Sequence, residues 1–320
     1  MSHYPPQCRG HSNTANDIGT GEHASVSLTF YLGAIFFPPM PVITRKVSSL
    51  TDFINQVISL RDQWTAEERK RAKEAEDQGD HYDNEPLPIW FRGQANARWK
   101  LVPKLYRMAD SNESEIRTEF RQRGLQLISE GQVPRDDKEW YFLMQHFGAP
   151  TRLLDWTDGA LIALYFAVKE QNRYANGSVW MLDAGWFNDA VLNDHNPDNY
   201  ISGVILPEWP EFADWFPTPF SQNLNVAYPV AVDPPHVARR VSVQRSRFTI
   251  HGKDRIGLDV IANGLPRTRL AKMLIPNQVG KEILKNLQTC GIVETSVFPD
   301  LEGLSRELLT KWTKIKHGQS

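Results

Sequence analysis

The stretch from Trp140 to Val168 constrains the fold of this 320-residue chain most, because it predicts three consecutive buried elements. The aromatic-rich run from Trp140 to Phe147 predicts a helix. Gly148-Ala149-Pro150 ends that helix, since proline cannot continue it and glycine permits a reversal. The short apolar run at 151–156 then predicts a buried strand.

The third element is a helix from Ala160 to about Val168 that is apolar on all sides, which predicts that it lies inside the protein. We expect Thr157 or Asp158 to cap this helix with a side-chain oxygen. An unpaired buried polar group costs roughly 1–3 kcal/mol, so the polar residues among these elements must find partners. They form either a structural network or a site: His146, Thr151, Arg152, Asp155, Thr157 and Asp158.

Composition bounds the class of protein. An apolar content of 41% is ordinary for a soluble chain with a sizeable core, and a net charge of −2 argues against general affinity for nucleic acid. Two cysteines far apart in sequence make neither a disulfide framework nor a metal cluster, which fits a reducing cytoplasm. No apolar stretch reaches the roughly 18 residues of a membrane span. We therefore expect a cytoplasmic protein without membrane contact.

Residues 1–41 differ in composition from the rest, and we predict an N-terminal extension before a single domain at 42–320. The extension begins polar and then carries one apolar run, Val26–Pro39, without helical period. Two interpretations stay open. Either translation starts natively at Met40, or the segment is a flexible tail whose apolar run pairs as an edge strand. Mass spectrometry of the native N-terminus distinguishes them, because a peptide spanning residues 20–35 would exclude the internal start.

The segment Leu87–Gln94 is the second informative stretch. Ile89 to Phe91 predicts a short strand that ends in Arg92-Gly93. An arginine fork at a strand end can hold phosphate or carboxylate bidentately, and the glycine allows close backbone approach or a bulge. The alternative is an arginine paired with an internal Asp or Glu for structure.

The remaining pattern predicts an α+β fold with a central, mostly antiparallel split sheet flanked by helices. Ser49 begins a helix with one apolar face, and the charge-rich run at 65–83 is a solvated helix end or a mobile loop. Residues 187–205 and 207–220 are expected to be long surface excursions. Further strands are predicted at 177–183, 228–234, 239–244, 248–252 and 270–275, and further helices at 113–131, 281–290 and near the C-terminus.

No metal site is expected, because His146 has no second ligand at suitable spacing on its helix. Hydrolase-elbow, Walker and dinucleotide-binding glycine patterns are absent from the sequence. An aspartate-based phosphatase is disfavoured, because Asp155 and Asp158 lie too far apart for that motif.

Several separated motifs together resemble the FRG-domain family, named for its Phe-Arg-Gly triplet. The resemblance covers roughly Leu50 to Leu309 and makes 42–320 a single FRG domain. It implies a bacterial protein associated with phages or mobile elements, of poorly defined biochemistry. The motifs that carry it are Phe91-Arg92-Gly93, Trp99…Leu101…Pro103, Gln145 to Trp156, Ala163 to Ala167, Phe298 to Leu301, and Gln244 with Phe248-Thr249.

A weaker resemblance is to ADP-ribosyltransferases of the arginine–serine–glutamate type. Phe91-Arg92-Gly93 is similar to their first motif, Leu154 to Ala167 to the second, and Val243 to Ile250 to the third. This resemblance implies NAD as a substrate, used by a transferase or a glycohydrolase in phage conflict, with a protein or nucleic-acid acceptor. It also implies an ADP-ribosyltransferase-like sheet with a cleft between the Arg92 strand and the Asp155 strand.

The resemblance assigns catalytic roles to Arg92, Asp155, Thr157 and Gln244. Arg92 would hold the diphosphate or a ribose, and Asp155 or Thr157 would contact the nicotinamide ribose. Gln244 would stand where these enzymes place a catalytic Glu, but a neutral amide cannot act as a general base. Either Asp155 supplies the charge, or the protein binds a nucleotide without turnover. The expected cofactor-binding residues are Arg92, Gly93, Gln145, His146, Arg152 and Trp156, with the central aromatics stacking on a base.

A second function class stays open, a non-catalytic nucleotide- or nucleic-acid-binding module. In that reading a set of arginines grips phosphates: Arg92, Arg152, Arg240, Arg245 and Arg247. Nicotinamide release would favour the first class, and salt-dependent RNA binding the second.

Overall fold

A computed structural model describes residues 41–79, 86–128, 133–171, 174–192, 203–207, 215–216, 226–233 and 245–313. The predicted extension at 1–41 lies almost wholly outside the described residues, as do the predicted strand at 239–244 and Gln244. The domain boundary proposed from composition therefore stays a prediction.

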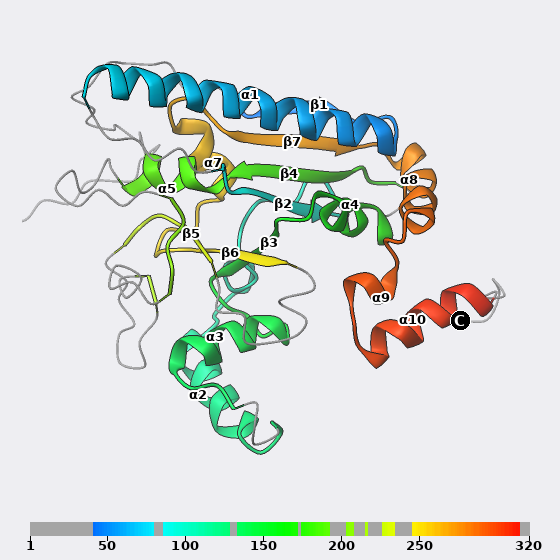
Figure 1. The fold of residues 1–320 in the computed structure, drawn as a ribbon. Coiled ribbons are helices and arrows are strands. Elements are labelled where there is room, and N and C mark those ends of the chain that lie inside the picture. Colours follow the sequence, from blue (N-terminus) through cyan, green and yellow to red (C-terminus); the bar gives the residue numbers. More distant parts are fainter. Residues whose placement is uncertain are drawn as a thin grey trace, which may run out of the picture. The chain divides into compact units, whose positions relative to one another are not determined.

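The described residues form one sheet of seven strands in the order β1-β7-β4-β2-β3-β6-β5 (Figure 1). Only β1 and β7 pair in parallel, and every other neighbouring pair is antiparallel. The predicted α+β fold with a mostly antiparallel sheet is confirmed. The strands are β1 (Ile43–Lys46), β2 (Ile89–Gln94), β3 (Leu153–Thr157), β4 (Gly177–Asp183), β5 (Val230–Val232), β6 (Ser246–Ile250) and β7 (Leu270–Ile275).

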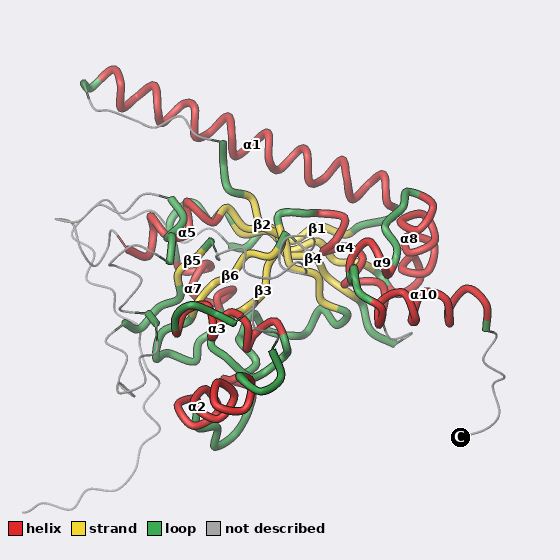
Figure 2. The backbone as a smooth tube through the Cα atoms, turned by 60° about the horizontal axis from the view of Figure 1, so that its bottom comes forward, coloured by secondary structure: helices red, strands yellow, loops and turns green. Residues whose placement is uncertain are grey.

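Helices surround this sheet, as the view in Figure 2 shows. On one face α1, α4 and α8 share a core with Phe91, Met181 and Met273, and α3 continues that face over β3, β6 and β5. On the other face α5 and α7 pack with Trp90, Trp156 and Trp180. The helices are α1 (Leu50–Asp77), α2 (Glu113–Gly124), α3 (Asp137–His146), α4 (Ala160–Lys169), α5 (Ala184–Leu192), α7 (Leu258–Gly264), α8 (Asn277–Thr289), α9 (Glu294–Val297) and α10 (Leu301–Trp312), with a 3-10 turn, η1 (Leu105–Arg107).

The central stretch folds as its sequence predicts, apart from one detail. Helix α3, strand β3 and the buried helix α4 follow one another, and no described residue of α4 is exposed. The predicted cap at Thr157 or Asp158 is wrong, because α4 begins after Gly159 without a side-chain cap. Thr157 Oγ1 instead accepts from the Gly159 N–H at 3.0 Å, so it stabilises the turn before the helix.

Two segments differ from the loop expectations. The charged run after Trp64 continues α1 as helix to Asp77, which is the solvated-helix interpretation. Residues 184–192 form α5, where a surface excursion was expected from Phe187 onward. Phe187 and Val191 are buried against the sheet, so tertiary packing outweighs the loop-like composition.

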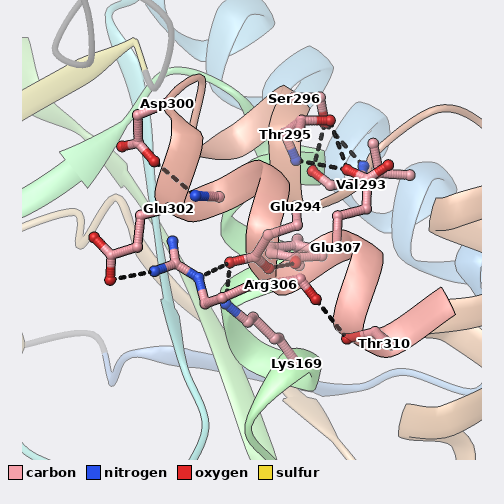
Figure 3. A network of polar contacts seen from close by, with 12 residues as sticks. Lys169, Val293, Glu294, Thr295, Ser296, Asp300, Glu302, Arg306, Glu307 and Thr310 are labelled. Atoms are coloured by element: carbon pink, nitrogen blue, oxygen red, sulfur yellow. Dashed lines mark hydrogen bonds and ion pairs between the residues drawn. The ribbon is translucent and has the colours of Figure 1, made fainter. Parts of the chain in front are cut away.

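The C-terminal helices are held to α4 by a buried carboxylate. Figure 3 shows Glu294 of α9 among cations from two other helices. Its carboxylate lies 2.8 Å from Lys169 Nζ and 2.6 Å from Arg306 Nε, and it accepts the Tyr165 hydroxyl proton at 2.5 Å. These hydrogen bonds lower the pKa of Glu294 although burial opposes them. The contacts therefore fix the Phe298-Pro299-Asp300 turn, which lies between α9 and α10.

Candidate functional site

The neighbouring strands β2 and β3 separate from each other within the sheet. β2 pairs with β4 at six register positions and β3 pairs with β6 at five, but β2 and β3 share only the pair Phe91–Thr157. A continuous ladder would bring Arg92 opposite Trp156 and Gly93 opposite Asp155. The strands separate there instead, so the side chains of Arg92 and Asp155 stand where the sheet splits.

The chain that follows β2 lines the same opening. The Leu105 N–H donates to the Thr151 carbonyl at 3.3 Å, which ties η1 to the start of the β3 strand. The Tyr106 hydroxyl donates to the Gly252 carbonyl, just beyond β6. These two hydrogen bonds tie η1 to the residues just before β3 and just after β6. Burial lowers the pKa of Arg92, and Arg107 of η1 adds to this effect.

Arg92 carries a buried charge with few partners. Its Nη1 donates to the Asp155 carbonyl at 2.5 Å and lies 3.8 Å from Asp155 Oδ2. Its Nε is buried and has no hydrogen-bond partner among the described residues. Burial lowers the pKa of Arg92, and the Asp155 carboxylate only partly opposes this. The side chain is 19% exposed, and among the described residues its one carboxylate partner, Asp155, lies 3.8 Å away.

The Asp155 carboxylate is also held by the Gln145 side chain of α3. Gln145 Nε2 lies 2.9 Å from both carboxylate oxygens, and the Thr151 hydroxyl donates to the Gln145 carbonyl oxygen. The Asp155 side chain is 56% exposed, so a ligand can reach it. Thr151, Gln145 and Asp155 make a polar relay that ends at Arg92, and this relay unites three of the predicted site residues.

Arg152 does not belong to this group. Its guanidinium is buried, with Nε 2.7 Å from Glu113 Oε2, and Glu113 also accepts the Tyr141 hydroxyl proton. The Arg152 N–H donates to the Tyr141 oxygen at 2.9 Å, and burial raises the pKa of Tyr141 well above its ordinary value. Its charge thus serves an internal pair with Glu113 of α2, and its expected role in holding a ligand stays a prediction.

Trp156 and Gly93 also have structural roles in the packing of the domain. The Trp156 ring faces the core opposite Asp155, and its indole N–H donates to Thr249 Oγ1 at 3.2 Å. A Cβ at Gly93 would lie 1.9 Å from the Ala163 carbonyl oxygen of α4. The close backbone approach predicted for this glycine is therefore real, but the partner is a helix of the same chain. The structure gives both residues, and the buried aromatics of α3, a packing role, and their expected ligand contacts stay predictions.

The remaining expected site residues are Thr157, His146 and Gln244, and they differ in their exposure to solvent. Thr157 is buried, and its hydroxyl oxygen accepts a hydrogen bond from the Gly159 N–H. The His146 ring packs edge-to-face on Phe147, with ring centroids 5.1 Å apart, and Phe147 is 66% exposed. Gln244 lies outside the described residues, so its proposed place in the site stays a prediction.

His251 is a site neighbour that sequence reasoning missed. Its ring is fully buried, its Nδ1 has no hydrogen-bond partner among the described residues, and its Nε2 lies 3.4 Å from Thr249 Oγ1. Burial, and then the nearby Arg92 cation, lower the pKa of His251 to about 3. The imidazole is therefore neutral at physiological pH. A lone histidine after an apolar strand carries no sequence signal of such a position.

Within the residues that the structure describes, no group of three His, Cys, Asp or Glu side chains could hold a metal ion. Across the same residues, none of the helices has the length and apolar character that crossing a bilayer requires.

Comparison with known families identifies the region that contains the opening. Residues 88–176 match the family described as the FRG domain. The match is narrower than the expected Leu50–Leu309, but it contains β2, α3, β3 and α4 and thus Arg92, Gln145 and Asp155. No curated protein and no solved structure matches the chain, so nothing found supports the weaker likeness to ADP-ribosyltransferases. The chain therefore contains a region, residues 88–176, that matches the FRG domain.

Proposed function

We propose that the opening between β2 and β3 binds a phosphate-bearing nucleotide, and that NAD is its substrate. The observation that carries the proposal is the incompletely paired Arg92 guanidinium, which lies 3.8 Å from a carboxylate that is itself half exposed. Burying an unpaired charge is costly, and a guanidinium binds phosphate through a planar fork. A ligand phosphate would supply the missing counter-charge.

Asp155 would act on the ribose of the same ligand. Cleaving the bond between nicotinamide and ribose builds positive charge on the sugar, so a fixed carboxylate nearby lowers the barrier electrostatically. Nicotinamide leaves with the electron pair of the broken bond, and the sugar carbon takes water or an acceptor nucleophile. The two contacts from Gln145 Nε2 fix the Asp155 carboxylate, which meets the positioning that such a reaction needs.

The competing function, in which scattered arginines grip a nucleic-acid backbone, receives less support. Arg152 is paired with Glu113, and Arg245 and Arg247 with Asp158 at 2.5 and 3.1 Å. Arg247 also lies 3.0 Å from Asp233. Cations already neutralised inside the chain attract phosphate weakly. Arg240 lies outside the described residues.

The test measures NAD-dependent thermal stabilisation together with nicotinamide release. Arg92→Ala should weaken NAD binding by about tenfold or more, because a charge-assisted hydrogen bond contributes about 1.5–3 kcal/mol. Asp155→Asn should keep binding and lose release. Arg245→Ala is the matched control, because Arg245 is 60% exposed and its charge is paired with Asp158, just after β3, and not with Asp155. Wild-type protein that neither binds NAD nor releases nicotinamide would exclude the proposal, as would Arg92→Ala binding with unchanged affinity.

A further inference from the structure

The segment that contains β2, η1 and the loop between them has an unusual charge pattern. Residues 86–109 contain five Lys or Arg and no Asp or Glu, although the whole chain has a net charge of −2. Four of these cations come after β2, on the 97–107 loop. They are Arg98, Lys100, Lys104 and Arg107.

The backbone of this loop is fixed while its charged side chains face solvent. Leu101 and Leu105 are buried, the Leu101 N–H donates to Asp259 Oδ1 at 3.2 Å, and the Trp99 N–H donates to the Asn96 carbonyl at 3.1 Å. All four cations are exposed. A backbone that is already fixed loses little further backbone entropy when a partner binds.

The four cations also differ from the arginines elsewhere in the domain. The described part of the chain offers no ion pair to any of them within 4.0 Å, whereas Arg152, Arg245, Arg247 and Arg269 all have carboxylate partners. Lys104 Nζ donates to a neutral group, the Gly148 carbonyl, at 2.6 Å, so its charge is not cancelled. The loop is therefore a local source of positive potential.

An aromatic ring stands among these charges. Trp99 lies between Arg98 and Lys100 and is 51% exposed. An exposed indole flanked by uncancelled cations suits a base that stacks while the neighbouring phosphates are bound. Stacking on a side chain requires a base that is not already stacked within a duplex, which favours a single strand.

We propose that the 97–107 loop binds single-stranded nucleic acid, with Trp99 stacking on a base and the four cations contacting phosphates. The loop adjoins β3, because the Leu105 N–H donates to the Thr151 carbonyl at 3.3 Å. The proposal goes beyond the proposed NAD chemistry and does not depend on it, since the strand would bind without NAD and without Arg92.

Fluorescence polarisation with labelled 12-nucleotide oligo-dT and oligo-U, without NAD, tests the loop. Trp99→Ala should weaken binding by about 5- to 150-fold, the range for loss of one stacked base. Trp312→Ala is the matched control, because Trp312 is another exposed indole, on α10, and should leave affinity unchanged. Circular dichroism establishes that both variants are folded.

The salt dependence tests the cations separately. Four phosphate contacts to a single strand give a slope of log K against log salt of about −2.8, and Arg98→Gln with Lys100→Gln should halve it. Neutralising Lys281 and Lys285, exposed on α8, should leave the slope unchanged. Absence of binding, tighter binding of a duplex of equal length, equal affinity in Trp99→Ala, or equal displacement by an acidic peptide of matched charge would overturn the proposal.

Discussion

Gly93→Ala tests whether the glycine of the Phe-Arg-Gly triplet is required for helix packing. The added Cβ would lie 1.9 Å from the Ala163 carbonyl oxygen and 2.9 Å from the Ala167 nitrogen. An ordinary carbon–oxygen contact is about 3.3 Å, so α4 would have to move by about 1.4 Å. Both neighbours are backbone atoms of a buried helix, which cannot rotate away as a side chain does. The clash must therefore displace the helix or the strand.

The expected cost follows from this displacement. Overpacking of a core typically costs about 1–3 kcal/mol, and a backbone clash places Gly93→Ala at the upper end, about 3 kcal/mol. For a domain of this size that lowers the melting temperature by about 6–12 °C. Urea denaturation followed by circular dichroism measures the change in the free energy of unfolding.

Gly264→Ala is the matched control for this substitution. A Cβ at Gly264, the last residue of α7, meets no atom within 4 Å. Alanine there should be neutral or stabilising by up to about 1 kcal/mol, because glycine loses more conformational freedom on folding. If Gly93→Ala and Gly264→Ala unfold at the same urea concentration, the packing explanation for the triplet's glycine is wrong.

Two further predictions concern buried titratable groups. Burial and then Arg92 lower the pKa of His251 to about 3, while the unfolded value is about 6.5. The unfolded state therefore binds more protons between these values, and the free energy of unfolding should fall by about 3 kcal/mol on acidification from pH 7 to 4.5. His251→Gln should lack this component, and pH profiles that run parallel in the two proteins would refute it. Glu294→Ala removes the acceptor of the Tyr165 hydroxyl and should cost about 2 kcal/mol, whereas Glu302→Ala, in an exposed pair, should change stability by less than about 0.5 kcal/mol in the same urea titration. Equal effects of these two substitutions would contradict the role given to the α9 carboxylate.

The elements that could be predicted from sequence are those with a strong local pattern. The buried strand β4 has its predicted bounds of 177–183, and α3, β3 and α4 appear in the predicted order. Strand β1 was missed, since its sequence Ile-Thr-Arg-Lys contains one apolar residue and two cations. It exists because it pairs in parallel with the buried strand β7 at the sheet edge, a long-range contact that no local pattern reveals.

Site residues could be predicted only where the relevant contact follows from local geometry. Asp155 and Trp156 are adjacent in a strand, so alternation alone places their side chains on opposite faces of the sheet. Arg152 is different, because its partner Glu113 comes from α2, far earlier in the chain. His251 owes its depressed pKa first to burial and then to Arg92, which lies far away in the sequence. The sequence could predict the face of the sheet toward which a strand side chain points. It could not predict which charged residues of distant elements form pairs.

The Phe-Arg-Gly triplet marks the point at which the sheet separates, and each residue has its own reason to be there. Phe91 forms the last register pair with β3 and faces the core beneath α4. Gly93 faces the same helix and admits its backbone. Arg92 lies between them on the other face, yet its guanidinium reaches the Asp155 carbonyl that the broken ladder leaves without a strand partner. The packing role of Gly93 and the proposed ligand-binding role of Arg92 are therefore separable by mutation. Gly93→Ala should reduce stability whatever the ligand, and Arg92→Ala should reduce nucleotide affinity beyond any change that its loss of stability explains.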